Sequence, residues 1–182
     1  MAIRQLGAKR ECTQNTLVFF LLKCSFCKEH ILMQNGKINK IWELLNTVPD
    51  PEIPVISVVE LGVIRDVTFT KNSYIISITP TYSGCPAVKA FQDDIKVCLK
   101  ENGITNFELK IVYSPAWTTD WMTDATKEKL RKYGIAPPSD TVICPRCNSE
   151  KTTLISDFGA TACKALYKCS NCLEPFEFFK CI

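Results

Sequence analysis

The first strong pattern along the chain is a stripe of apolar residues three and four positions apart. The stripe consists of Ile38, Ile41, Leu44, Leu45 and Val48. Residues at this spacing lie on one face of an α-helix, so the pattern predicts an amphipathic helix over residues 37–48. Pro49 follows, and because proline has a fixed φ and no N–H, the helix is expected to end there.

Strand patterns and two more helical patterns come next. Two β-rich runs, residues 63–69 and 74–79, are separated by a short polar segment, which is typical of a β-hairpin with one buried face. A helical pattern over residues 87–102, a β-rich run over 107–113 and a charged helical pattern over 124–133 complete the series. The order helix, two strands, helix, strand, helix predicts a small α+β sandwich domain.

The domain organisation follows from these elements and from the prolines after them. The sandwich domain is expected to span residues 37–136, and the proline-rich residues 137–140 indicate a linker. Residues 141–182 then form a small second module. Residues 1–36 join poorly to this pattern and are an unassigned extension, within which Met33 is a candidate start of translation.

The composition is that of a globular protein. Of the 182 residues 46% are apolar and 23% are charged, which is enough apolar material to bury a core. The net charge is only +3, and because binding to a phosphate backbone needs a basic surface, no nucleic-acid partner is expected. The apolar run at residues 17–22 is far shorter than the ~20 residues that span a membrane, so no membrane partner is expected either.

The chain lacks the residues that two kinds of catalytic chemistry need. The chain contains one histidine, His30, and no Gly-x-Gly-x-x-Gly motif. A diiron carboxylate site uses paired Glu-x-x-His motifs, and a dinucleotide site uses the glycine motif. The sequence therefore assigns neither oxygenation nor hydride transfer to this chain, and it identifies no catalytic residue.

Four of the eleven cysteines form two Cys-x-x-Cys pairs in the last module. The pairs are Cys144 with Cys147 and Cys169 with Cys172. Each pair can place two sulfurs on one ion, so the two pairs predict a closed tetrahedral site of a zinc ribbon, with zinc in a structural role. Iron could occupy the same four sulfurs. Cysteines used as thiolate ligands favour a reducing compartment, and a cytoplasmic location is expected.

Cys85 is the most suggestive single residue. Gly84 allows a sharp turn after the second strand, and Pro86 fits the first turn of the following helix. The sulfur is then expected near unpaired backbone N–H groups at the positive helix end, where it could bind a metal, receive a cluster or act as a nucleophile. The alternative is a small buried cysteine that fills a strand–helix junction. These residues alone leave both interpretations open.

Five further residues are supporting candidates. Asp50 and Glu52, in a proline-rich loop, could supply carboxylates to a metal, although a turn-capping role is the preferred interpretation. Trp117 and Asp120, in an aromatic loop, either pack over the sheet or form a partner-binding patch. Cys163 lies in the last module outside the two pairs and is either an extra ligand or, in the preferred interpretation, a buried thiol.

Seven short segments form a combination that is more specific than any one of them. They are residues 50–54 (Asp-Pro-Glu-Ile-Pro), 60–62 (Glu-Leu-Gly), 79–86 (Thr-Pro-Thr-Tyr-Ser-Gly-Cys-Pro), 117–121 (Trp-Thr-Thr-Asp-Trp), 134–138 (Gly-Ile-Ala-Pro-Pro), 158–164 (Phe-Gly-Ala-Thr-Ala-Cys-Lys) and 174–176 (Glu-Pro-Phe). From residue 37 to 182 the chain resembles the PaaD (also called PaaJ) family of the bacterial phenylacetyl-CoA epoxidase system. Residues 37–136 also resemble the wider family of iron-sulfur cluster assembly and targeting factors, through the Asp-Pro-Glu turn and the cysteine in a strand-to-helix turn.

The resemblance implies an iron-sulfur-assembly-like sandwich domain followed by a zinc ribbon. In the assembly family the cysteine that matches Cys85 is the functional residue, so Cys85 is expected to handle iron or an iron-sulfur cluster transiently. The implied partners are the oxygenase and reductase subunits of phenylacetyl-CoA epoxidase. The implied role, in aerobic phenylacetate degradation, is a non-catalytic accessory one that assists the maturation of their metal centres. The alternative is a stoichiometric subunit that contributes to turnover, and self-association into a homodimer is left open.

Overall fold

The computed structural model describes residues 25–181 of the chain, with side chains from residue 35 onward. The chain divides into two compact units, Met1–Asn39 and Lys40–Ile182. Helix α2, Ser25–Leu45, spans this division. It starts earlier than the helix predicted over residues 37–48 and also ends earlier. Of the expected extension, residues 1–24 lie outside the described part, and residues 25–36 belong to α2.

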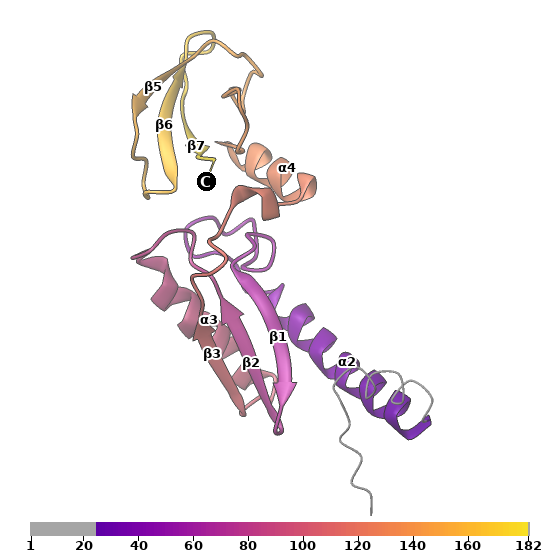
Figure 1. Cartoon of the computed structure of the whole chain (residues 1–182). Helices are drawn as coiled ribbons and strands as arrows, with labels where there is room; N and C mark the ends of the chain where they lie inside the picture. The colour runs from indigo at the N-terminus through magenta and orange to yellow at the C-terminus, as the bar shows by residue number, and fades with distance from the viewer. Residues whose placement is uncertain (1–24, 182) are drawn as a thin grey trace, which may run out of the picture. The chain divides into compact units, whose positions relative to one another are not determined.

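The second unit begins with a three-stranded sheet in the order β1-β2-β3 (Figure 1). Strands β1, Ile64–Thr70, and β2, Ser73–Ile78, form the predicted antiparallel hairpin. Its turn residues Lys71 and Asn72 have φ values of 49° and 62°, the left-handed conformation that short hairpin turns require. Strand β3, Phe107–Ile111, pairs in parallel with β2, so a crossover must connect the two.

Helix α3, Ala87–Glu101, is this crossover and lies along one face of the sheet (Figure 1). Its buried residues Phe91, Ile95 and Leu99 follow the predicted apolar stripe. They pack in the same core as the fully buried strand residues Ile76 and Ile78. The α+β sandwich predicted from periodicity is confirmed.

A loop and a short helix lead to the last module. The 3-10 helix η1, Thr119–Trp121, is followed by α4, Asp124–Tyr133. The side chain of Thr123 accepts a hydrogen bond from the Thr126 N–H and caps the start of α4, and Gly134, with φ of 98°, ends it. The predicted charged helix over residues 124–133 is therefore confirmed.

The last module is a four-stranded sheet in the order β4-β7-β6-β5. The strands are β4, Ile135–Ala136; β5, Thr152–Ser156; β6, Lys164–Cys169; and β7, Pro175–Phe179. The buried strand β4 pairs in parallel with β7. The ribbon sheet therefore includes two residues that precede the linker expected at residues 137–140, because these apolar residues complete the edge of the ribbon sheet.

Trp117 joins the sandwich to the ribbon. Its side chain is 3% exposed, its Nε1 donates a hydrogen bond of 3.0 Å to the Leu61 carbonyl, and its ring lies 6.0 Å from that of Phe179 in β7. The aromatic loop thus packs in the interior at Trp117. Next to it, the Arg65 guanidinium lies 3.3 Å from the centre of the Trp121 ring, a cation–π contact.

The Trp117→Phe variant is expected to lose stability. The substitution removes the indole N–H and leaves the Leu61 carbonyl without its donor, a loss of about 1–3 kcal/mol in the free energy of unfolding. Chemical denaturation measures this loss. Tyr113→Phe is the matched control, because Tyr113 is 63% exposed and its change should stay within ~0.5 kcal/mol of zero. Equal denaturation midpoints for the two variants would contradict the bridging role of Trp117.

Candidate metal and thiol sites

Four cysteines meet in the ribbon. Cys144 and Cys147 lie on a tight turn closed by backbone hydrogen bonds from Asn148 N–H to Cys144 and from Cys144 N–H to Ser149. Cys169 is the last residue of β6, and Cys172 lies on the turn that follows this strand. All four sulfurs lie within 4.8 Å of one another.

The sulfur positions fit a single tetrahedral ion. The Cys144 and Cys172 sulfurs are 3.7 Å apart, and the Cys147 and Cys169 sulfurs are 3.5 Å apart. A zinc–sulfur bond of ~2.3 Å implies an edge of about 3.8 Å between sulfurs in a tetrahedron. The four ribbon cysteines are therefore placed so that they could hold one metal ion.

Hydrogen bonds stabilise the thiolate form at Cys147 and Cys169. At Cys172, in contrast, a backbone contact at Glu174 is outweighed by burial and the neighbouring ribbon sulfurs, which raise the pKa to about 12. The Asn171 side-chain amide donates to the Cys147 sulfur at 3.6 Å, and this contact, with a backbone contact at Ser149, lowers the pKa of Cys147 to about 6. The backbone N–H groups of Cys172 and Asn171 donate to the Cys169 sulfur and lower its pKa. Because metal binding requires deprotonated cysteines, these donors favour metal uptake.

The ribbon site is closed. Cys144 and Cys169 are 0% exposed and belong to one apolar cluster with Phe176 and Phe178. With four sulfurs on one ion, no coordination position is left for a substrate. This site can hold the ribbon together, and a second site must carry any chemistry that needs an open ligand.

Cys85 lies in the turn between the first sheet and α3. Its N–H donates to the Tyr82 carbonyl, and its own carbonyl accepts from the Val88 N–H in the first turn of α3. Gly84 has φ of 89°, and Pro86 is the N-cap residue of α3. The turn thus holds the half-buried Cys85 next to a helix start.

Gly84 is needed for its backbone conformation and not for space, since a Cβ there would meet no atom within 4 Å. Gly84→Ala is expected to cost ~1 kcal/mol in the free energy of unfolding and to change the rate at which iodoacetamide alkylates Cys85. The control is Gly36→Ala, since Gly36 lies in α2 with equally open space and alanine favours helix. An unchanged stability and alkylation rate in Gly84→Ala would show that the turn does not depend on this conformation.

A small cavity adjoins Cys85. Its volume is about 10 Å³, and it is lined by Cys85, Cys163, Asp50, Glu52 and Thr81 together with apolar residues that include Phe91 and Phe179. Such a volume holds about one water molecule. The cavity can therefore take a single ion and cannot enclose an organic substrate.

The carboxylates next to this cavity differ in role. Asp50 is 4% exposed and accepts backbone hydrogen bonds from Glu52 and Ile53 at 2.8 and 2.6 Å, so it caps the proline-rich loop. Burial raises the pKa of Asp50, although these two N–H groups act in the opposite direction. Glu52 is partly exposed, and its side chain makes no hydrogen bond or ion pair within residues 35–181.

Burial also affects the thiol of Cys163, which lines the cavity, and the phenol of Tyr82, which lies beside Cys85. Burial raises the pKa of Cys163, and the adjacent Glu52 and Cys85 act in the same direction. Burial, and then the nearby Cys85, raise the pKa of Tyr82. Both groups are therefore neutral at physiological pH, and a bound cation would be needed to draw the proton from Cys163.

The structure thus brings Cys85 together with Asp50, Glu52 and Cys163. Trp117 does not line the cavity, but its ring packs near the ring of Phe179, which does. Asp120 does not line it either: it is exposed and borders a different surface hollow with Cys181. The sequence pointed to Cys85 and Cys163 separately, and no spacing signal indicated that they would meet.

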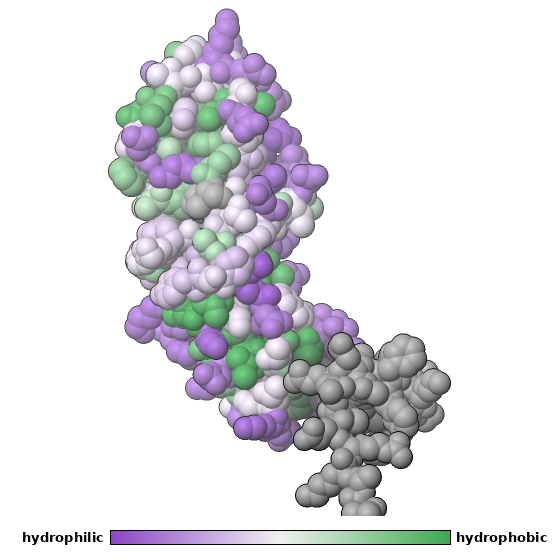
Figure 2. All heavy atoms as spheres, in the orientation of Figure 1, coloured by the Kyte–Doolittle hydropathy of each residue, from purple (hydrophilic) through white to green (hydrophobic). Residues whose placement is uncertain are grey.

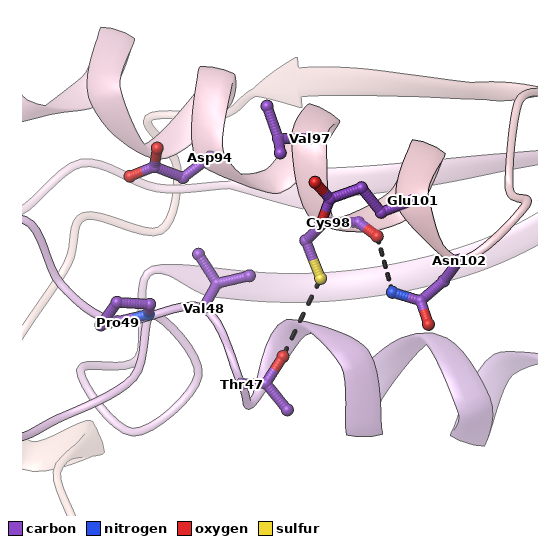
Figure 3. A pocket seen from close by; sticks show the side chains of 8 residues that line it. All are labelled: Thr47, Val48, Pro49, Asp94, Val97, Cys98, Glu101 and Asn102. Carbon is purple, nitrogen blue, oxygen red and sulfur yellow. Dashed lines mark hydrogen bonds between the residues drawn. The ribbon is translucent and has the colours of Figure 1, made fainter.

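A larger hollow, of about 440 Å³, lies between the end of α2 and α3 (Figure 3). There the Cys98 sulfur points toward the Thr47 hydroxyl, 3.9 Å away, and also donates to the Leu44 carbonyl. The remaining lining is a mixture of the apolar residues Val48, Pro49 and Val97 with polar side chains, and among the described residues it contains no second thiol. The side chains that line this hollow do not indicate a particular kind of ligand.

The molecular surface is mixed. Figure 2 shows hydrophobic patches separated by hydrophilic residues on the visible face. Within residues 25–181, no helix has both the length and the apolar content needed to cross a membrane.

Comparisons with known proteins agree with this architecture. Residues 38–104 match the family described as iron-sulfur cluster assembly protein, and residues 132–180 match the PaaD zinc beta ribbon domain. A solved Bacillus anthracis structure, described as a domain of unknown function, DUF59, aligns with a TM-score of 0.51 and 31% identity. It covers 55% of this chain and 96% of that one.

Two curated relatives extend the comparison. A protein of Escherichia coli (strain K12), named as a subunit of a "Putative 1,2-phenylacetyl-CoA epoxidase", is 49% identical over 155 residues, which are 80% of this chain and 94% of that protein. The Bacillus subtilis (strain 168) "Fe-S protein maturation auxiliary factor YitW" is 32% identical over 100 residues, which are 54% of this chain and 97% of that protein.

The fold and the two sites define a protein in which an iron-sulfur cluster assembly domain is joined to a zinc ribbon. The ribbon matches the PaaD zinc beta ribbon domain, and the Escherichia coli relative aligns with this chain over 94% of its own length. These two findings narrow the class to a single family. The chain belongs to the PaaD family.

Proposed function

We propose that this chain is a non-catalytic accessory protein of a phenylacetyl-CoA epoxidase system. It assists the maturation of a metal centre in the oxygenase or reductase component, and Cys85 carries the iron or iron-sulfur cargo. The Escherichia coli relative supports the assignment to the epoxidase system, and the relatives named as Fe-S protein maturation auxiliary factors support the maturation role.

The proposal rests on the difference between the surroundings of the four ribbon sulfurs and those of the Cys85 sulfur. Four cysteines close on one another in the ribbon, while Cys85 is half-buried and lines a separate cavity with carboxylates. Because that cavity has a volume of only about 10 Å³, it suits an ion and excludes an acyl-CoA. Cys85 is therefore better placed to handle metal than to act on the organic substrate.

Zinc is the metal proposed for the ribbon. Zn²⁺ accepts four thiolates in a tetrahedron without any preference from d-electrons, and the spacing of the four sulfurs meets that geometry. Cys144, Cys147, Cys169 and Cys172 would hold the ion, which supplies folding free energy to the module. Iron suits the same sulfurs, and metal analysis of protein purified without added metal distinguishes the two.

A second candidate function is a stoichiometric subunit that contributes to epoxidase turnover. The name of the Escherichia coli relative, which calls it a subunit, favours this alternative. A turnover subunit would be needed in every catalytic cycle, whereas a maturation factor would be needed only until the metal centres are filled.

Reconstitution separates the two functions. Oxygenase and reductase components are first loaded fully with metal, and phenylacetyl-CoA epoxidation is then measured with and without this chain. A maturation factor predicts equal rates, and it predicts that the chain is required only when the components start metal-depleted. A loss of rate on omission from fully loaded components would support the turnover role instead.

A further inference from the structure

Two thiols from distant parts of the sequence line the same cavity. Cys85 precedes α3 in the assembly domain, and Cys163 precedes β6 in the ribbon. Cys163 is 6% exposed, and its sulfur lies 3.1 Å from the Thr161 hydroxyl. Cys85, Cys163 and Glu52 all line this one cavity. Two cysteines and a carboxylate therefore border a space of ion size, whose other walls are largely apolar.

The charges around the cavity favour a cation. Asp50 and Glu52 contribute carboxylates. Lys164, the nearby positive charge, is already paired with Glu177 at 2.7 Å, so it does not leave an unbalanced ammonium beside the cavity. Asp50 is occupied by the backbone of its own loop, and Glu52 is the carboxylate that can turn to an ion.

Unlike the four ribbon sulfurs, the donor atoms at this cavity are not already arranged to coordinate an ion. Within residues 35–181 only the four ribbon cysteines have ligand atoms that all lie within 4.8 Å of one another. The donors at the cavity must shift to coordinate an ion, and that movement weakens binding. Weak, incomplete coordination is suited to an ion that must be released, because open positions let another protein's ligands attach before the first bonds break.

We propose that one ferrous ion binds between Cys85 and Cys163, with Glu52 as an oxygen ligand, so that the cargo site is shared by the two domains. This inference rests on the proposed function and deepens it. Binding forms two iron–sulfur bonds and one iron–oxygen bond to Glu52 as water leaves the hydrated ion, and each thiol releases its proton to solvent. On transfer, ligands of the recipient replace the two thiolates and the carboxylate one at a time, each thiolate takes up a proton, and the iron stays ferrous throughout.

The shared site gives the ribbon a second role. By holding Cys163 opposite Cys85, the folded ribbon completes the cargo site. Thiolate and carboxylate ligands together suit ferrous iron, zinc and cobalt(II), so cobalt(II) can be used as a coloured probe of the site.

The test is an anaerobic cobalt(II) titration of the full chain with zinc already in the ribbon. Absorption from sulfur-to-cobalt charge transfer reports how many thiolates bind. Wild-type protein is expected to bind one further cobalt(II) ion with two thiolates. Cys163→Ser is expected to bind it at least about tenfold more weakly, with the charge-transfer absorption reduced to that of one thiolate, and Glu52→Gln to weaken binding without removing a thiolate.

The matched control is Cys181→Ser, an exposed cysteine of the same ribbon that is outside the cavity. Its titration should equal that of wild type. Zinc content and circular dichroism are measured for every variant. If Cys163→Ser loses zinc or fold, arsenite decides the matter in zinc-loaded wild-type protein, because one arsenic of this small inorganic reagent bridges two neighbouring thiols and peptide mapping by mass spectrometry locates the bridge.

The outcomes separate the two claims. A Cys163→Ser titration equal to the control, or arsenic bound without joining Cys85 to Cys163, overturns the shared site. If Cys85→Ser alone then abolishes cobalt binding, the proposed function stands with Cys85 as a single sulfur ligand. Absence of any further cobalt site in wild-type protein overturns both claims.

Discussion

The Cys169→Ser variant is expected to lose the folded ribbon. Cys169 is 0% exposed and part of the apolar cluster, and it is one of the four cysteines that could hold a metal ion. Residues 141–182 are only 42 residues long, which is too few for hydrophobic burial alone to stabilise a domain. A structural metal supplies on the order of 10 kcal/mol in zinc-finger peptides, so loss of one ligand removes most of the free energy that folds this module.

Metal analysis and limited proteolysis check this result. The variant should contain far less than one metal per chain, and protease should cut between residues 141 and 181 while a fragment containing β1 to β3 persists. Cys181→Ser is the control, since Cys181 is exposed and is not a ligand; it should retain its metal and resist cleavage. A protease-resistant ribbon in metal-free Cys169→Ser would contradict the structural role of the metal.

The second large effect is expected outside the chain, in the iron content of the epoxidase components that we propose it helps to mature. When Cys85→Ser is co-expressed with the epoxidase oxygenase and reductase, at least one of these components should be purified with only a small part of its iron. The physical reason is that serine has the shape of cysteine without the soft thiolate that binds iron. Iron analysis of each purified component, with wild-type chain in parallel, gives the measurement.

Cys98→Ser is the matched control for that experiment. Cys98 is half-buried in the same domain, and its sulfur contacts Leu44 and Thr47 away from the Cys85 cavity. Components co-expressed with Cys98→Ser should therefore be fully loaded. Full loading of both components with Cys85→Ser as well would remove Cys85 from the maturation role.

Much of the fold could be predicted because its signals are local. The hairpin follows from alternation on either side of a polar turn, and α4 follows from Thr123 and Gly134 at its two ends. The ribbon cysteines follow from two Cys-x-x-Cys pairs, whose sulfurs the structure brings within 4.8 Å of one another. In each case the residues that determine the structure lie within a few positions of one another.

The neighbourhood of Cys85 could not be predicted in the same way. Cys163 reaches it only because β6 and β7 place the ribbon against the Trp117 loop through Phe179. This contact depends on how two domains pack, and no periodicity or spacing encodes that packing. The parallel edge strand β4 was missed for a related reason, since Ile135 and Ala136 pair with β7 about forty residues later in the chain.

Direct transfer of iron tests the central claim that Cys85 carries cargo while the ribbon sulfurs serve structure. Zinc-loaded wild-type and Cys85→Ser chains are incubated anaerobically with ferrous iron, freed of unbound metal, and mixed with iron-depleted oxygenase or reductase. After separation, iron is measured in each recipient. The account predicts that wild-type chain delivers iron to a recipient and that Cys85→Ser delivers almost none, with zinc unchanged in both. Equal delivery by the two chains, or iron moving only when the ribbon loses its metal, would contradict it.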